Sequence, residues 1–141
     1  MLKITTKGRY ALRIMIDLAK RQDEGFISLK QISERQGVSV KYLEMIAGVL
    51  NKAGLVQSLR GKHGGYKLAL PPEACTAGTV LKLTEGDLAP VTCLAYGENK
   101  CERAARCETL PFWQGLDQVI DNYVESVTIA DMMGREVLRS S

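Results

Sequence analysis

The chain has 141 residues and a formal net charge of +3, with 45% hydrophobic and 25% charged residues. This length fits one domain, or a small domain with an appended segment, and the composition excludes collagen-like, mucin-like and largely disordered proteins. The longest stretch without a charged residue has ten residues, Leu88 to Gly97, so we expect no membrane partner and a cytoplasmic protein, because a membrane-spanning helix needs about 20 apolar residues.

The first part of the chain contains three segments of helical period. From Thr6 to Arg21 apolar residues recur every three or four positions, which predicts a first helix. The run Ser-Leu-Lys-Gln that starts at Ser28 has the form of a capping box, so we expect a short second helix that ends at Gly37. Ser39 can cap a third helix that ends near Gly54. Two short helices separated by Gly-Val-Ser are typical of a helix-turn-helix.

After Gly54 the period of the pattern changes from that of a helix to that of a strand. Leu55–Arg60 and Tyr66–Leu70 are predicted to form two strands. Between them lies Gly-Lys-His-Gly-Gly, residues 61–65, whose glycines allow a hairpin loop and whose charge is basic. Three helices followed by a hairpin with a basic tip form the plan of a winged helix-turn-helix.

The charge of +3 conceals two halves of opposite sign. Residues 1–72 hold 13 Lys and Arg against 5 Asp and Glu, whereas residues 73–141 hold 6 against 11. A basic half favours a polyanionic partner such as nucleic acid, because neutralising phosphates releases counterions; a solvated basic surface is the alternative. We therefore predict a winged helix-turn-helix DNA-binding domain over residues 1–72 and a second region over residues 73–141.

Double-stranded DNA is the partner that this pattern favours, because the major groove admits one helix whose first turns reach base edges. In the third helix the residues so placed are Ser39, Val40, Lys41, Tyr42 and Glu44. Lys41 and Tyr42 can reach phosphates or base acceptors, and Glu44 can accept a hydrogen bond from a cytosine amine. The loop residues expected near the adjoining minor groove are Arg60, Gly61, Lys62, His63 and Gly64. The structural alternatives are a Tyr42 that packs against the second helix, a Ser39 that only caps its helix and a His63 that is only an exposed loop residue.

Three segments of the chain resemble a known family. TTKGRYALR near the N-terminus, ISERQGVSVKYLE at residues 32–44 and GLVQSLRGKHGGYKL at residues 54–68 are similar to the IscR-type winged-helix regulators, the Rrf group that includes IscR and NsrR. The resemblance extends to about residue 130. It implies a homodimeric bacterial transcription factor that binds a pseudo-palindromic operator. It also places Arg60 and the polar residues of the third helix at the family's DNA-contacting positions.

All four cysteines lie in the acidic half: Cys75, Cys93, Cys101 and Cys107. The last three have the spacing C-x7-C-x5-C. In a chain that we expect to be cytoplasmic, clustered thiols favour a metal or a cluster over disulfides. The spacing leaves free thiols, zinc and an iron-sulfur cluster open, because it lacks both the C-x2-C pairs of zinc sites and the ferredoxin pattern. We expect Cys75 to be an apolar core residue.

By the resemblance, Cys93, Cys101 and Cys107 hold an iron-sulfur cluster, which we expect to be 2Fe-2S, with 4Fe-4S as the alternative. The IscR branch completes its site with a His three residues after the third Cys, where this chain has Leu110, and the NsrR branch uses an Asp where this chain has Arg9. The fourth ligand is therefore open; the candidates are Glu108, which we favour, Glu98, Glu102, Thr109, solvent or an external thiol.

A long helix is predicted from Pro111 onwards, because apolar residues recur at spacings of three and four. They are Phe112, Trp113, Leu116, Val119, Ile120, Tyr123, Val124 and Val127. The stripe could pack within its own subunit, but we expect a homodimer interface, as in the family. The expected fold is mainly α with a small β-hairpin wing: a winged helix-turn-helix domain followed by a long C-terminal dimerisation helix.

These features predict a dimeric DNA-binding transcription regulator and not an enzyme, since the chain has no Ser-His-Asp set and no phosphate loop. We expect a repressor whose operator binding is modulated by the cluster and which, by the resemblance, controls iron-sulfur cluster biogenesis genes. The alternative is a winged-helix regulator that senses a small metabolite or a redox state through free thiols. A small electron carrier would leave the basic half unexplained.

Overall fold

The computed structural model describes residues 3–94 and 104–134 of the chain. This part is mainly helical, with one two-stranded antiparallel hairpin, which confirms the expected fold class. Its helices and strands are α1 (Thr6–Lys20), α2 (Leu29–Gln36), α3 (Val40–Lys52), β1 (Val56–Leu59), β2 (Gly65–Leu68), α4 (Ala77–Glu85), α5 (Leu110–Ser126) and α6 (Ile129–Met133). None of the described helices is long and apolar enough to cross a membrane.

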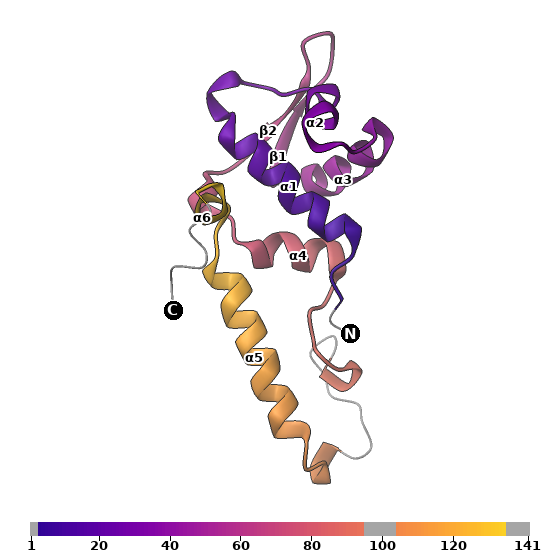
Figure 1. Cartoon of the computed structure of the whole chain (residues 1–141), viewed down its shortest axis with the longest axis vertical. Helices are drawn as coiled ribbons and strands as arrows, with labels where there is room; N and C mark the ends of the chain where they lie inside the picture. The colour runs from indigo at the N-terminus through magenta and orange to yellow at the C-terminus, as the bar shows by residue number, and fades with distance from the viewer. Residues whose placement is uncertain (1–2, 95–103, 135–141) are drawn as a thin grey trace.

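The elements divide into a winged-helix end and a projecting arm. Helices α1, α2 and α3 and the hairpin gather at one end, α4 lies beside α1, and α5 extends away from both (Figure 1). Helix α6 then returns to pack on α1. Helices α4 and α6, both from the second half of the sequence, therefore pack on the first helix.

Local capping signals fix the two helices of the helix-turn-helix, as the sequence predicts. Ser28 Oγ accepts a hydrogen bond from the Gln31 amide at 3.2 Å, and Gln31 Oε1 accepts one from the Ser28 amide at 3.0 Å. Gly37 ends α2 in the left-handed conformation, at φ 68°, which glycine adopts without steric cost. Ser39 Oγ then accepts from the Tyr42 amide at 3.2 Å and begins α3.

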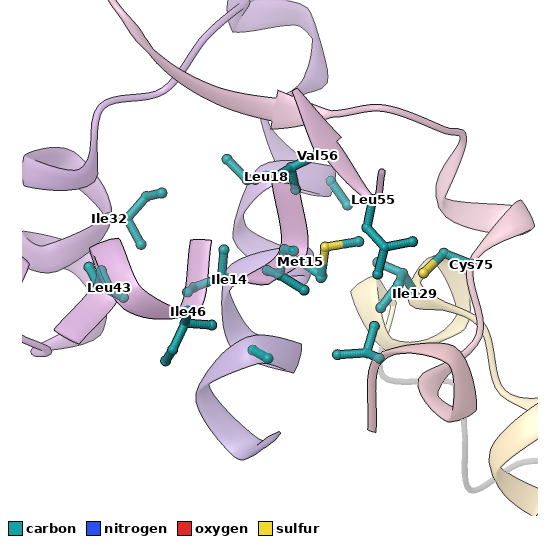
Figure 2. Close-up of a cluster of buried hydrophobic side chains, with 14 of the residues drawn as sticks. Ile14, Met15, Leu18, Ile32, Leu43, Ile46, Leu55, Val56, Cys75 and Ile129 are labelled. Carbon is teal, nitrogen blue, oxygen red and sulfur yellow. The ribbon is translucent and has the colours of Figure 1, made fainter. Parts of the chain in front are cut away.

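The hydrophobic core is centred on α1 and draws on both halves of the sequence. Figure 2 shows Ile14, Met15 and Leu18 of α1 among buried side chains of the helix-turn-helix, the hairpin and the later elements. Cys75 and Ile129 belong to this same cluster, and Cys75 is 1% exposed. Its burial confirms the expected core role. The boundary after residue 72 stays a prediction, with core residues from both of its sides in contact.

The hairpin is shorter than the sequence predicts, with Val56 paired to Leu68 and Leu59 to Gly65. An added Cβ at Gly65 would overlap the carbonyl of Ile27. The absence of a side chain allows Tyr66 to exchange two backbone hydrogen bonds with Ile27, each of 2.8 Å. The wing is thereby attached to the segment that precedes α2.

Helix α5 is joined to α4 by charged side chains. Lys82 Nζ of α4 lies 2.5 Å from Asp121 Oδ1 and 3.7 Å from Glu125 Oε2 of α5. The hydrogen bond from Lys82 to Asp121 raises the pKa of Lys82, and the negative charge of Glu125 acts in the same direction. Thr76 Oγ1 also donates to Glu125 Oε1 at 2.8 Å. These contacts fix the end of the arm that is nearest to the winged helix.

Candidate nucleic-acid interface and cysteine segment

The start of α3 is exposed, but its five candidate residues have different environments. The side chains of Val40, Lys41 and Glu44 are exposed. Ser39 is also exposed, and its hydroxyl caps the helix. Tyr42 is half-buried, with its ring 5.8 Å from that of Tyr10 in α1 and an interplanar angle of 81°. Its ring therefore packs against α1, whereas the alternative considered from the sequence was packing against the second helix.

The exposed face of α3 continues beyond the residues that the sequence singled out. Met45, Gly48 and Lys52 are exposed as well. With Lys41 they follow the spacing of four, three and four residues that places side chains on one face of a helix. Met45 was not among the residues predicted from the sequence to contact DNA. Its distance from the buried positions Leu43 and Ile46 along the helical wheel is the signal that could have found it.

The tip of the wing is exposed and its glycines are structurally required. The exposed residues of the tip are Arg60, Gly61, Lys62 and His63, and Gly64 is half-buried. Gly61 has φ 114°, a conformation that side chains disfavour. An added Cβ at Gly64 would overlap the carbonyl of Leu59. The loop therefore presents Arg60 and Lys62 to solvent on a tightly folded backbone.

A buried carboxylate holds α2 against α1. Asp17 of α1 is 3% exposed and accepts hydrogen bonds from Arg35 Nε at 3.0 Å, from Arg35 Nη2 at 2.7 Å and from Gln36 Nε2 at 3.0 Å. Arg13, one turn earlier in α1, donates to Gln36 Oε1 at 2.9 Å and to the Gln36 carbonyl at 2.6 Å. The C-terminal end of α2, which leads into α3, is thus fixed by two residues of α1.

The Asp17 carboxyl remains ionised in this environment. Burial by itself raises the pKa of Asp17, but the hydrogen bonds from Arg35 and Gln36 and the positive charges of Arg35 and Arg21 outweigh it and hold the pKa below the usual range. Arg35 in turn has a raised pKa, mainly because of its hydrogen bond to Asp17. The interaction is therefore a charged, bidentate pair, which is stronger than a neutral hydrogen bond.

The cysteine segment connects α4 with α5. Cys93 lies in a short 3-10 turn (Thr92–Leu94) and Cys107 follows another (Ala104–Arg106); both side chains are half-buried. Cys107 Sγ is 3.4 Å from the hydroxyl of Thr109. The third predicted ligand, Cys101, and the alternatives Glu98 and Glu102 lie outside the described residues. Glu108 is exposed.

The side chains of Cys93 and Cys107 are chemically suitable ligands for an iron-sulfur cluster, since thiolates are the usual ligands of such clusters. Among residues 3–94 and 104–134, no group of three or more His, Cys, Asp or Glu side chains lies in a position to hold a metal ion. Cys93 and Cys107 by themselves would be only part of a donor set, and a complete set would require ligands from the intervening segment or from outside the chain.

A hydrogen-bonded contact links the start of the cysteine segment to α1. Glu85, the last residue of α4, accepts a hydrogen bond from the Thr5 amide at 2.5 Å and one from the Thr5 hydroxyl at 3.0 Å. Thr5 is the N-cap of α1. An added Cβ at Gly8 would lie 3.1 Å from Thr84 Oγ1, so glycine allows the close packing of the two helices here.

Helix α5 carries an exposed apolar face. None of the residues of α5 is fully buried, and Phe112, Leu116, Val119 and Tyr123 are exposed, Phe112 to 65% and Val119 to 63%. Val119 and Tyr123 also border an apolar hollow between α5, α4 and the N-terminal segment, together with Ile4, Leu81 and Leu88. Large exposed apolar faces on soluble chains mark interaction surfaces.

Comparison with known proteins finds transcriptional regulators. Residues 4–135 match Rrf2, described as an iron-dependent transcriptional regulator. The chain is 38% identical to the transcriptional regulator IscR of Aliivibrio salmonicida over 132 residues, which are 94% of this chain and 77% of that protein. It is also 38% identical to IscR of Vibrio cholerae over 141 residues, covering 99% of this chain and 80% of the relative.

Solved structures with the same fold include regulators of two kinds. CymR, described as the global cysteine regulator of B. subtilis, superposes with a TM-score of 0.80 at 41% identity, covering 96% of this chain and 98% of that one. IscR of T. potens superposes with a TM-score of 0.72 at 35% identity, covering 99% and 92%.

Proposed function

The chain belongs to the Rrf2 family of transcriptional regulators, and from this we propose that it binds an operator in double-stranded DNA through α3 and the wing. The family and these relatives are regulators and not enzymes. The observation that carries the proposal is the exposure of Lys41, Glu44 and Arg60 on a winged helix whose half of the sequence is strongly basic. Such side chains suit phosphates and base edges.

Removing the guanidinium of Arg60 tests the contact between the wing and DNA. We expect Arg60→Ala to weaken binding to an operator duplex, selected from a random DNA library with the unsubstituted protein, by about 1–3 kcal/mol. Fluorescence anisotropy measures the affinity. Arg60→Lys is the matched control, because it keeps the charge and loses the planar donor pair. Unchanged affinity in Arg60→Ala would contradict the assignment of the wing.

We further propose that two copies of the chain pair through the exposed apolar face of α5. The support is the row of exposed apolar side chains, Phe112, Leu116, Val119 and Tyr123, on a helix with no fully buried residue. A two-fold axis would present two α3 helices to successive major grooves, about 34 Å apart. An inverted-repeat operator would match this symmetry.

We propose that Cys93, Cys101 and Cys107 hold an iron-sulfur cluster that modulates DNA binding. Of the two cluster types we favour 2Fe-2S. The support for a cluster is the similarity to proteins named IscR and the thiolate chemistry of the donors. Leu110 departs from the histidine of the IscR branch, so Glu108 or an external group would complete the site. On the same similarity, the chain would repress genes of cluster biogenesis.

The contacts of α1 supply a physical route from the cysteine segment to the DNA-facing helices. Glu85 binds the N-cap of α1 at the point where the cysteine segment begins. The same helix holds α2 through Asp17 and meets α3 through the Tyr10–Tyr42 contact. A change in the segment that displaces Glu85 would be transmitted to the helix-turn-helix through packed elements, as coupling between sites requires.

Anaerobic purification tests the cluster directly. We expect a brown protein with visible absorbance and about one cluster for each subunit, and Cys93→Ser should lose this absorbance while Cys75→Ser keeps it. The affinity for the selected operator should change when the cluster is removed. A colourless protein that contains one zinc ion for each subunit would contradict the cluster proposal.

A cluster-free thiol regulator is the second candidate, and the similarity to CymR, a cysteine regulator, favours it. The half-buried thiols of Cys93 and Cys107 would then respond to oxidants or small thiols. Treating the metal-free protein with the thiol oxidant diamide, then with dithiothreitol, separates the two. Reversible loss of operator binding in a protein that never carried a cluster would support this candidate.

A further inference from the structure

The outermost face of α3 has an unexpected composition. The buried side chains of the helix are Leu43, Ile46, Ala47 and Leu50. At 100° for each residue, the face opposite to them is formed by Lys41, Met45, Gly48 and Lys52. Two lysines thus enclose a methionine and a glycine on the surface that points away from the core.

Met45 is 48% exposed, although methionine is an apolar residue that usually fills gaps in protein cores. The positions of α3 that face the core are occupied by the four residues named above, and Met45 is not one of them. Its position in the centre of a basic face suggests an apolar contact with something outside the chain.

Gly48 gives a second, independent observation. A glycine inside a helix makes the helix less stable than an alanine at the same position would. Its φ is not positive, and a Cβ added to it would meet no other atom within 4 Å. Neither backbone conformation nor packing within the described chain explains this glycine. A surface that must come close to the backbone of α3 would explain it.

We propose that Met45 contacts the 5-methyl group of a thymine in the major groove and that Gly48 allows the backbone of α3 to lie close to the DNA. The inference rests on the proposed DNA-binding function. The thymine methyl is the apolar group that the major groove displays, and apolar side chains distinguish thymine by contacting it. Lys41 and Lys52, at the two ends of the face, are placed to contact phosphates on either side.

The charge of this face favours DNA over a protein partner. The face carries two lysines and no acidic residue, and it belongs to a half of the chain with 13 basic against 5 acidic residues. Glu44, beside this face, would be repelled by phosphates but can accept from a cytosine amine. Met45 therefore adds an apolar contact beside a polar one, which predicts a thymine next to or near the cytosine in each half-site.

The first experiment removes only the methyl group from DNA. Duplexes that bind the full-length protein are selected from a random library, and each thymine of the selected site is replaced in turn by deoxyuridine. We expect at least one position in each half-site at which the replacement weakens binding about fourfold, the loss expected for one buried methyl-sized group. No weakening at any thymine would overturn the proposal.

The second experiment assigns that methyl group to Met45. Met45→Ala should bind the thymine and deoxyuridine duplexes equally well, whereas Met45→Leu, which keeps an apolar side chain of similar volume, should retain most of the fourfold preference. An equal preference for thymine in Met45→Ala and the unsubstituted protein would refute the assignment. Failure to enrich any duplex in the selection would instead refute the proposed binding of operator DNA, and the proposed contact of Met45 would then be refuted as well.

The third experiment separates folding from DNA contact at Gly48. Gly48→Ala should raise the melting temperature, because alanine is the better helix former, and should still weaken operator binding. Gly115→Ala in α5 is the matched control, since Gly115 is also an exposed helical glycine with open space around it; it should raise stability with no loss of affinity. A Gly48→Ala variant that binds as tightly as the unsubstituted protein would overturn the close approach.

Discussion

Asp17 is the buried charged residue that joins α1 to α2 within the described part of the chain. It lies on the otherwise apolar inner face of α1 and is paired with Arg35 by two hydrogen bonds. A buried charge of this kind is tolerated because its hydrogen bonds and ion pair compensate for lost hydration. The charge and position of Asp17 therefore specify how α2, and with it α3, lies on α1.

Replacing Asp17 tests this role through stability and pH. We expect Asp17→Ala to lower the free energy of unfolding by about 3 kcal/mol, the loss typical of a broken buried pair. Because the pKa of Asp17 is lowered in the folded state, its stabilisation is complete above the unfolded pKa of about 3.9 and is lost as the pH falls through the folded pKa. Urea unfolding from pH 7 to pH 3 should therefore show a weaker dependence on pH in Asp17→Ala. Equal slopes would contradict the ion pair.

We expect the cysteines to differ in reactivity, because they differ in burial. Burial raises the pKa of the Cys75 thiol, and the thiolate is the reactive form. In the native, metal-free protein we expect iodoacetamide to modify Cys93 and Cys107, which are half-buried, much faster than Cys75, which is 1% exposed. Mass spectrometry of the peptides measures the three rates, and the unfolded protein in urea is the control, in which the difference should disappear.

At the scale of elements, α1 is the helix that the other parts share. It packs against α2, α3, α4 and α6, and its N-cap residue Thr5 is held by Glu85 of α4. The arm α5 packs against α4, which in turn packs against α1. Helix α1 is therefore one element through which a change in the cysteine segment would affect the position of α3, and α4 also contacts α3 directly.

Replacing Glu85 tests the link between α4 and α1. Glu85→Gln removes the charge that accepts from Thr5, and we expect the free energy of unfolding to fall by about 1 kcal/mol, since the pair is partly exposed. Glu73→Gln, at another exposed carboxylate of the acidic half, should have no such effect. If Glu85 transmits the state of the cysteine segment, the ratio of operator affinities with and without the cluster should also move towards one. A ratio equal to that of the unsubstituted protein would exclude this route.

At the scale of the whole molecule, the projecting arm explains why a single copy exposes so much apolar surface. Helix α5 projects away from the winged-helix end and contacts α4 (Figure 1). Its side chains Phe112, Leu116, Val119 and Tyr123 are exposed. Burying such a row would release water from apolar surface, which is the main driving force of association. The proposed pairing of two copies would bury it.

A charge placed on this face should prevent pairing. We expect Val119→Glu to convert a dimer into a monomer in size-exclusion chromatography with light scattering, because an unpaired carboxylate in an apolar interface is costly. Gln114→Glu adds the same charge on the other side of α5, where the side chain is exposed, and should remain dimeric. A Val119→Glu protein of unchanged mass would contradict the proposed interface.

The sequence by itself determined the local structure. Ser28 with its capping partner, Gly37 and Ser39 predicted the ends of α2 and α3, and the structure confirms them. These signals act between residues three or four positions apart, so they are readable without the fold. Periodicity likewise predicted the apolar face of α5, because a helix brings every third or fourth residue to one side. The ends of the short strands were misplaced, α6 was not predicted, and Val127, expected in the exposed stripe, lies after α5 and is buried.

The tertiary structure decided which residues meet over long distances and which remain exposed. Asp17 pairs with Arg35, 18 positions away, and Thr5 with Glu85, 80 positions away. No local pattern encodes these partners, because they depend on how the helices pack. Packing also placed the ring of Tyr42 against α1 and left Met45 exposed. An apolar residue in a helix can face the core or a partner, and only the neighbours supplied by the fold distinguish the two.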